Sequence, residues 1–105
     1  MSENSWTVRL SAAAEADYRL ILRWTAENFG LAQARSYADT LSSALTALSA
    51  GPEIIGVKVR PEIGNAIRTL HVARGGRKGR HFVLFRTDCL QGDKLIDVLR
   101  LAGLP

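Results

Sequence analysis

Residues 74–86 hold the side chains of this sequence that are best suited to binding an anion. The cations there are Arg74, Arg77, Lys78, Arg80 and Arg86, with three glycines among them and a short apolar run that follows. Cations at this density can bind phosphate, bind acidic side chains of a partner, or stabilise the charge that develops when RNA is cleaved. A turn that is merely solvated has the same composition, so the cluster alone leaves these roles open.

RNA cleavage by a 2′-hydroxyl needs an acid and a base as well as cations beside the phosphate. His71 and His81 are the only histidines, and each could in principle donate or accept a proton. Each also fits an ordinary position on a strand, which is the simpler interpretation. Tyr18 and Tyr37 fall on the apolar faces of expected helices, where we expect them in the core. The cations therefore lack a convincing acid–base partner, and we predict no catalytic residue.

Metal and cofactor sites are not indicated either. The two histidines and the one cysteine, Cys89, do not have the spacing of a structural zinc site. A single cysteine cannot form an internal disulfide, so nothing points to an oxidising compartment. The glycine-rich segment 74–80 links two strand patterns and does not open a helix, unlike a phosphate-binding loop. We therefore expect neither a metal nor a cofactor.

The charge is unevenly distributed along a chain of 105 residues, a length and composition typical of one globular domain spanning 1–105. Residues 1–50 have a net charge of −1, and residues 51–105 have a net charge of +5. A basic half favours an acidic or nucleic-acid partner, although a solvated basic face fits equally well. No apolar run approaches the roughly 18 residues of a membrane span, and the first residues lack a signal-peptide pattern. We expect a cytoplasmic protein.

The elements that must position these groups begin with two helices. Ser11 can cap a helix over 12–28, where apolar residues recur at helical spacing, and Gly30 can end it. A second apolar seam starts near Ala32 and stops at Gly51. Because the link between the two is so short, the helices must pack antiparallel as a helical hairpin.

Strand patterns occupy 6–10, 66–72, 80–87 and 94–101, and 51–65 reads as an irregular connection rich in glycine and proline. The last three strands are joined by short links that contain glycine, which predicts antiparallel hairpins. The order is therefore strand, helix, helix and three strands. We expect an α+β fold in which an antiparallel helical hairpin packs on a small antiparallel sheet.

The first helix also carries two large apolar residues outside its main seam. Leu20 and Trp24 lie four positions apart, so they share one side of the helix. If both are exposed they form an apolar stripe of the kind that marks a protein interface. A core with three sides would bury them instead.

Short motifs follow one another in a definite order through residues 8–56. They are Ser11, Ala14-Glu15-Ala16-Asp17-Tyr18, Trp24, Gly30, Ala34, Leu41, Leu45, Leu48, Pro52 and Gly56. The later strands, IRTLHV, HFVLFR and LIDVLRL, continue the series. Together these motifs resemble the ParE toxins of bacterial toxin–antitoxin modules, within the ParE/RelE superfamily. The resemblance covers nearly the whole chain and implies two antiparallel helices on an antiparallel sheet.

The resemblance also implies a function. ParE members are inhibitors that trap DNA gyrase on cleaved DNA, and each is neutralised by an antitoxin encoded beside it. RelE members share the fold but cut messenger RNA on the ribosome. The family commonly ends its last strand with Arg-Val-Leu-His; here Arg100 matches, while Gly103 stands at the usual His position. This difference favours gyrase inhibition. The alternatives are a RelE-like ribosome-dependent endoribonuclease and a non-toxic relative that still binds an antitoxin.

The expected partner is a ParD-like antitoxin, with a ribbon-helix-helix domain and a C-terminal tail that folds on the toxin into a hetero-oligomer. We expect neither membrane association nor sequence-specific binding of nucleic acid. The residues expected to contact the antitoxin are Leu20, Arg23, Trp24, Phe29, Arg80 and Arg86. Those expected to contact the gyrase target are Arg74, Arg77, Lys78 and Arg100.

Overall fold

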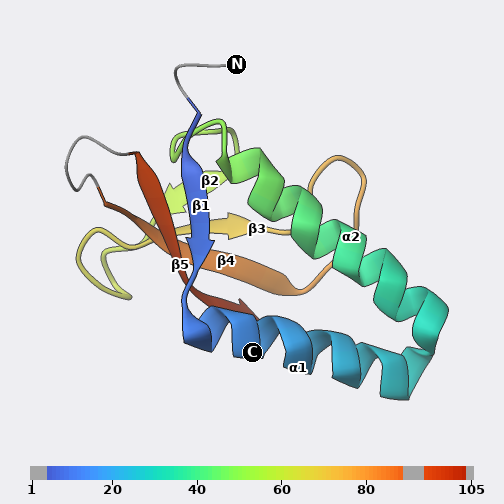
Figure 1. Cartoon of the computed structure of the whole chain (residues 1–105). Coiled ribbons are helices and arrows are strands. Elements are labelled where there is room, and N and C mark those ends of the chain that lie inside the picture. The colour runs from blue at the N-terminus through green and yellow to red at the C-terminus, as the bar shows by residue number, and fades with distance from the viewer. Residues whose placement is uncertain (1–4, 89–93, 104–105) are drawn as a thin grey trace.

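The protein, described here from a computed structural model that covers residues 5–88 and 94–103, has two layers. Its elements are β1 (Thr7–Leu10), α1 (Ala12–Phe29), α2 (Leu31–Leu48), β2 (Val57–Val59), β3 (Arg68–His71), β4 (His81–Asp88) and β5 (Leu95–Gly103). Figure 1 shows the two helices meeting at their shared link and diverging toward one face of the sheet. The expected α+β fold is confirmed.

The two helices are delimited by the residues that the sequence indicated. Ser11 caps α1, because its Oγ accepts the backbone N–H of Ala14 at 3.0 Å. Gly30 is the whole link between the helices and has a φ of +92°, a backbone conformation that side chains disfavour. Its N–H donates to the carbonyl of Ala26 at 3.0 Å, and its carbonyl accepts the N–H of Ala34 at 3.1 Å. One glycine therefore ends the first helix and starts the second.

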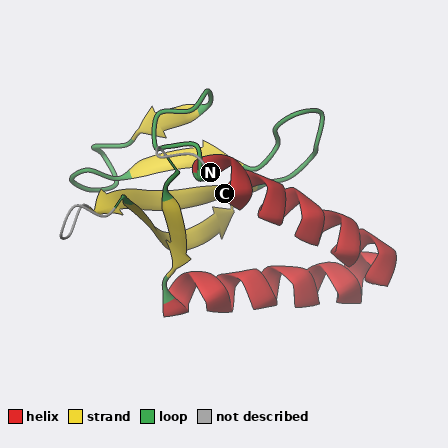
Figure 2. Cartoon of the chain, turned by 45° about the horizontal axis from the view of Figure 1, so that its top comes forward, coloured by secondary structure: helices red, strands yellow, loops and turns green. Residues whose placement is uncertain are grey.

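The sheet has five strands in the order β1-β5-β4-β3-β2. The antiparallel pairing of β3, β4 and β5 is confirmed, but the sheet is mixed, because β1 pairs in parallel with β5. The helical hairpin carries the chain from β1 to β2 at the opposite edge, and the antiparallel series from β2 to β5 then brings the last strand back beside the first in the same direction. Figure 2 shows this arrangement, with the hairpin on one side of the strands.

β2 was not expected. It lies in the segment 51–65, which was expected to be irregular, and pairs antiparallel with β3 through Val57 opposite Leu70. Three residues between Gly56 and Arg60 are too few to show an alternating pattern, so only the partner strand identifies this strand. The expected link between β4 and β5, which contains Cys89, lies outside the described residues.

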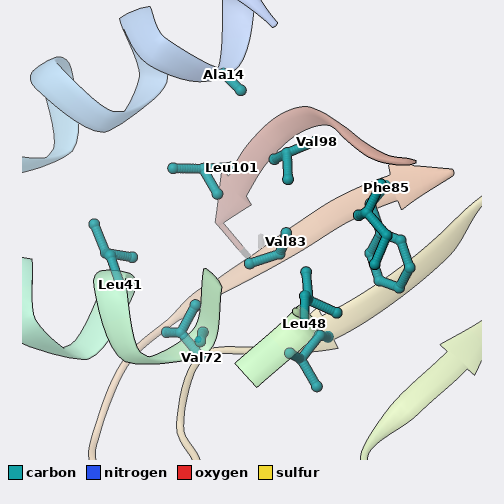
Figure 3. Close-up of a cluster of buried hydrophobic side chains, with 11 residues drawn as sticks. Ala14, Leu41, Leu48, Val72, Val83, Phe85, Val98 and Leu101 are labelled. Carbon is teal, nitrogen blue, oxygen red and sulfur yellow. The ribbon is translucent and has the colours of Figure 1, made fainter. Parts of the chain in front are cut away.

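The core fills the space between the hairpin and the sheet (Figure 3). From β4, Val83 and Phe85 point inward and are fully buried, whereas Phe82 and Leu84 lie on the other face and are partly exposed. This alternation puts His81 on the helix-facing side, at the end of the same strand. The buried core residues are Ala14, Leu41, Ala44, Leu48, Leu70, Val72, Val83, Phe85, Ile96, Val98 and Leu101.

Neither α1 nor α2, the two helices of the described part of the chain, has the length and hydropathy of a membrane-spanning segment. In residues 5–88 and 94–103, no group of three His, Cys, Asp or Glu side chains is arranged to hold a metal ion.

Candidate partner-binding groove

A groove of about 1340 Å³ lies between the helical hairpin and the segment that connects β3 to β4. We call it the hairpin groove. One wall comes from α1, the floor from α2, and the opposite wall from residues 76–81 together with the end of β5. Its lining residues are Leu20, Ile21, Arg23, Trp24, Thr25, Glu27, Phe29, Gln33, Ser36, Tyr37, Thr40, Gly76, Arg77, Lys78, Gly79, Arg80, His81 and Gly103.

The α1 wall of the hairpin groove carries three exposed large apolar side chains beside the ion pair of Arg23 and Glu27. Leu20, Trp24 and Phe29 are 60%, 57% and 63% exposed, and the rings of Trp24 and Phe29 meet edge to face with centroids 5.6 Å apart. The first half of α1 packs on β1 and β5, whereas the second half extends past the sheet (Figure 1) and has no strand to cover it. Clustered large apolar residues on a surface mark an interaction site. The stripe expected at Leu20 and Trp24 is therefore exposed.

The opposite wall belongs to the cation-rich segment between β3 and β4, residues 74–80, which we call the basic turn. Gly75 and Gly76 both have positive φ, +56° and +81°, and the N–H of Arg77 donates to the carbonyl of Arg74 at 2.9 Å. These are the features of a type I′ hairpin turn, which requires positive φ at both central residues. Arg77 also donates from Nη1 to Oγ1 of Thr40 at 3.4 Å, so the turn leans against α2.

The third glycine of this segment permits close packing. A Cβ added to Gly79 would lie 2.6 Å from Cγ2 of Val72 and 2.9 Å from the hydroxyl of Tyr37. No residue with a side chain fits at that distance without a shift of its neighbours. The glycines of this segment thus shape a turn that holds Arg77, Lys78 and Arg80 along the groove.

Tyr37 of α2 and His81 of β4 form a hydrogen-bonded pair in the groove. The tyrosine hydroxyl lies 2.5 Å from Nδ1 of His81 and accepts the backbone N–H of Arg80 at 3.2 Å. Burial raises the pKa of Tyr37. Burial also lowers the pKa of His81, and the neighbouring Arg80 lowers it further, against a smaller raising effect of Asp17. Both side chains are therefore neutral at pH 7.

Sequence reasoning missed this pair. Tyr37 was expected in the core and His81 in an ordinary strand position, and they lie 44 positions apart in the chain. One signal was present in the sequence. The alternation of β4 places His81 on the same face as Val83 and Phe85, which is the face that α2 covers.

The structure brings together most, but not all, of the residues expected to contact a partner. Seven of the ten line the hairpin groove: Leu20, Arg23, Trp24, Phe29, Arg77, Lys78 and Arg80. Arg74 lies outside it and donates from Nη2 to the carbonyl of Ile55 at 3.3 Å. Arg86 is exposed on β4, opposite Asp97 of β5. Arg100 is bound by Asp17, so its charge already has a partner within the fold.

The arrangement suits a bound peptide better than a small molecule. One wall offers exposed apolar side chains and the other offers cations. An amphipathic segment with acidic residues along one side would satisfy both. Tyr37 and His81 line the same groove, next to Arg80.

Comparison with known protein families returns one match that spans most of the chain. Residues 8–102 match the family described as ParE toxin of type II toxin-antitoxin system, parDE. No curated protein matches the sequence.

Comparison with solved structures returns proteins of the same fold at low sequence identity. The chain is similar to one from the chromosomal ParDE system of P. aeruginosa, at 18% identity and a TM-score of 0.76, over 98% of this chain and 100% of that chain. It is also similar to a chain of the RelBE2 toxin–antitoxin complex of Mycobacterium tuberculosis, at 19% identity and a TM-score of 0.62, over 98% and 95%. A YoeB/ParE toxin from Agrobacterium tumefaciens matches at 7% identity and 0.63, over 94% and 99%.

Proposed function

Because the chain belongs to the ParE toxin family of type II toxin–antitoxin systems, we propose that it inhibits DNA gyrase and is held inactive by a ParD-like antitoxin. The antitoxin's tail binds in the hairpin groove. Toxin and antitoxin form a hetero-oligomer in the cytoplasm, and the toxin acts as an inhibitor and not as an enzyme.

The observation that carries the antitoxin site is the pairing of two unlike walls across one groove. Leu20, Trp24 and Phe29 are each more than half exposed. Arg77 and Lys78 stand on the facing wall. A disordered tail that folds on binding has to offset its ordering entropy, and a preformed apolar groove supplies the buried area that does so. Acidic residues of the tail then meet the cations.

The gyrase target is supported by the family and by the last strand. Gly103 stands where the family commonly carries a histidine, so a terminal histidine that could serve a RelE-type nuclease is missing from that position. Target contacts are assigned to Arg74, Arg77, Lys78 and Arg100. A target contact at Arg100 has to compete with Asp17, whose carboxylate binds Nε and Nη2 of the guanidinium.

Expression of the chain without its antitoxin tests the target. Early loss of DNA synthesis with accumulation of cleaved gyrase–DNA complexes supports gyrase inhibition. Early loss of translation with cut messages supports a nuclease instead, and normal growth supports a non-toxic relative. We expect a small ribbon-helix-helix reading frame beside this gene, whose product should restore growth on co-expression and co-purify with the toxin.

One observation favours the nuclease as a second candidate. Tyr37 and His81 place a phenol and an imidazole beside Arg77, Lys78 and Arg80, which are the groups that cleavage by a 2′-hydroxyl requires. If this candidate is correct, Tyr37→Phe abolishes cutting of ribosome-bound messages while binding to the antitoxin remains.

A further inference from the structure

We propose that Tyr37 orients His81 so that the Nε2–H of His81 faces the hairpin groove and donates a hydrogen bond to a carboxylate of the antitoxin tail. This inference rests on the proposed function and adds to it a specific polar subsite. The subsite lies at the basic end of the groove, where Arg77, Lys78 and Arg80 also line the wall.

The two hydrogen bonds of the Tyr37 hydroxyl determine which ring nitrogen of His81 carries the proton. The hydroxyl oxygen of Tyr37 accepts the backbone N–H of Arg80, and its own proton points to Nδ1 of His81. A phenol is the stronger donor of the two neutral groups, and burial keeps Tyr37 protonated. A neutral imidazole carries one proton, so accepting at Nδ1 places that proton on Nε2.

Nε2 of His81 lies on the side of the imidazole ring that faces Gly103. Gly103 of β5 is the register partner of His81, and a Cβ there would lie 3.6 Å from Nε2 and 3.6 Å from Cδ2 of His81. Both His81 and Gly103 line the groove, and glycine leaves the space beside this nitrogen open. Among residues 5–88 and 94–103, Nε2 has no hydrogen-bond partner, so a donor is available to a ligand.

The charged neighbours of His81 are Arg80 and Asp17. Arg80 precedes it on the same strand, and Tyr37 packs against it from α2. The nearby acid is Asp17 of α1, which is occupied by the guanidinium of Arg100 and the N–H of Leu101. The described groups that face His81 are therefore cationic, neutral or already paired. An incoming carboxylate meets no free anion here.

The apolar residues beside this subsite favour a peptide carboxylate over a nucleic-acid phosphate. The subsite continues without a break into the apolar wall of Leu20, Trp24 and Phe29. A nucleic-acid backbone would satisfy the cations and leave that wall in water. An amphipathic peptide with acidic side chains covers both, which is why we assign the subsite to the tail of a protein partner.

Binding of a carboxylate favours the protonated form of His81. In the free toxin burial lowers the pKa of His81, and an anion at Nε2 raises it again. Affinity should therefore increase as pH falls through the pKa of His81 in the complex. A rise of about one unit in that pKa corresponds to about a tenfold gain in affinity, and the full gain is reached only below the pKa of His81 in the free toxin.

The test is nitrogen NMR of the full-length ¹⁵N-labelled chain. The probe is a peptide of about three helical turns built from leucine and glutamate, with a matched peptide that carries glutamine for glutamate. We expect free His81 to show the Nε2–H tautomer. The glutamate peptide should shift its ring nitrogens, raise its pKa and bind several-fold more tightly at about pH 6 than at about pH 8. The glutamine peptide should show no such pH dependence.

Three variants sharpen the test, each accepted only if its amide spectrum shows an intact fold. Tyr37→Phe should release His81 into a mixture of tautomers. His81→Gln, whose amide can donate from nearly the same position, should retain binding but lose the pH dependence. His81→Leu should weaken binding of the glutamate peptide several-fold while leaving the glutamine peptide unaffected.

The proposal is overturned if free His81 carries its proton on Nδ1, or if both peptides bind alike. It is also overturned if only inorganic phosphate or a short single-stranded oligonucleotide shifts His81, because the subsite would then belong to a nucleic acid. Affinity of the co-expressed antitoxin for His81→Leu separates the two hypotheses. Unchanged tight binding rejects this subsite alone, whereas no antitoxin binding to the unsubstituted toxin rejects the proposed function.

Discussion

Asp17 of α1 and Arg100 of β5 form a two-pronged ion pair between residues 83 positions apart in the chain. Nε of Arg100 donates to Oδ2 of Asp17 at 2.7 Å, and Nη2 donates to Oδ1 at 3.0 Å. The backbone N–H of Leu101 donates to the same carboxylate at 3.0 Å. The side chain of Asp17 is only 13% exposed. This contact holds the first helix to the last strand, next to the end of the hairpin groove.

Asp17→Asn should therefore destabilise the fold. The hydrogen bond from Arg100 holds the pKa of Asp17 below its ordinary value of 3.8, against an opposing effect of burial. We expect a loss of about 1–2 kcal/mol in the free energy of unfolding at neutral pH, measured by urea denaturation. A carboxylate with a lowered pKa stabilises the native state above its unfolded pKa. That contribution disappears as pH falls through the lowered value.

The difference between Asp17→Asn and the unsubstituted protein should thus be largest above about pH 5 and shrink below about pH 4. Unfolding curves recorded across this range check it. A difference that stays constant with pH would mean that the carboxylate charge does not contribute, and that the loss comes from packing.

Gly79→Ala should destabilise the protein without touching any charge. Its methyl group would collide with Val72 and Tyr37, at 2.6 Å and 2.9 Å from the nearest atoms. Overpacking of this kind costs about 1–3 kcal/mol. The matched control is Gly103→Ala, where a Cβ would lie at an ordinary 3.6 Å from Cδ2 and Nε2 of His81. Equal melting temperatures for the two variants would show that the 73–80 segment shifts freely to accommodate the methyl.

Trp24→Ala should weaken antitoxin binding and leave stability almost unchanged. The side chain is 57% exposed, so truncation removes little native packing beyond its contact with Phe29. An aromatic anchor in an interface is worth about 2 kcal/mol or more, which calorimetry with the co-expressed antitoxin can measure. Leu31→Ala is the control, because Leu31 is 68% exposed but lies outside the groove. If both variants bind alike, the apolar wall is not the interface.

Neutralising Arg77, Lys78 and Arg80 together should weaken antitoxin binding in a way that depends on salt. Charges across an interface act over about a Debye length, so the loss should be large at low ionic strength and small at high. The control replaces Arg19, Arg35 and Lys58, three exposed cations outside the groove, by glutamine as well. Both triple variants remove the same net charge. Equal antitoxin affinities of the two triple variants at low salt would show that the basic turn is only solvated and does not contact the antitoxin.

Much of the architecture was predictable because it is encoded locally. A serine that can accept a backbone N–H and a glycine that tolerates positive φ delimit the two helices, wherever the rest of the chain goes. The strands 81–88 and 95–103 show their alternation over enough residues to be recognised. The motif order of the ParE family also lies in the sequence itself. These features depend on neighbours within one or two turns of chain.

The tertiary structure determined the contacts between residues that lie far apart in the sequence. β1 lies parallel to β5 because the antiparallel series from β2 to β5 brings the chain back to that edge, and β2 exists because β3 supplies its hydrogen bonds. Tyr37 and His81 meet because α2 covers the inward face of β4. The sequence alone established the helices, the main strands, the basic turn and the family. Whether Trp24 is exposed, and whether a histidine has a tyrosine beside it, depends on how the layers pack.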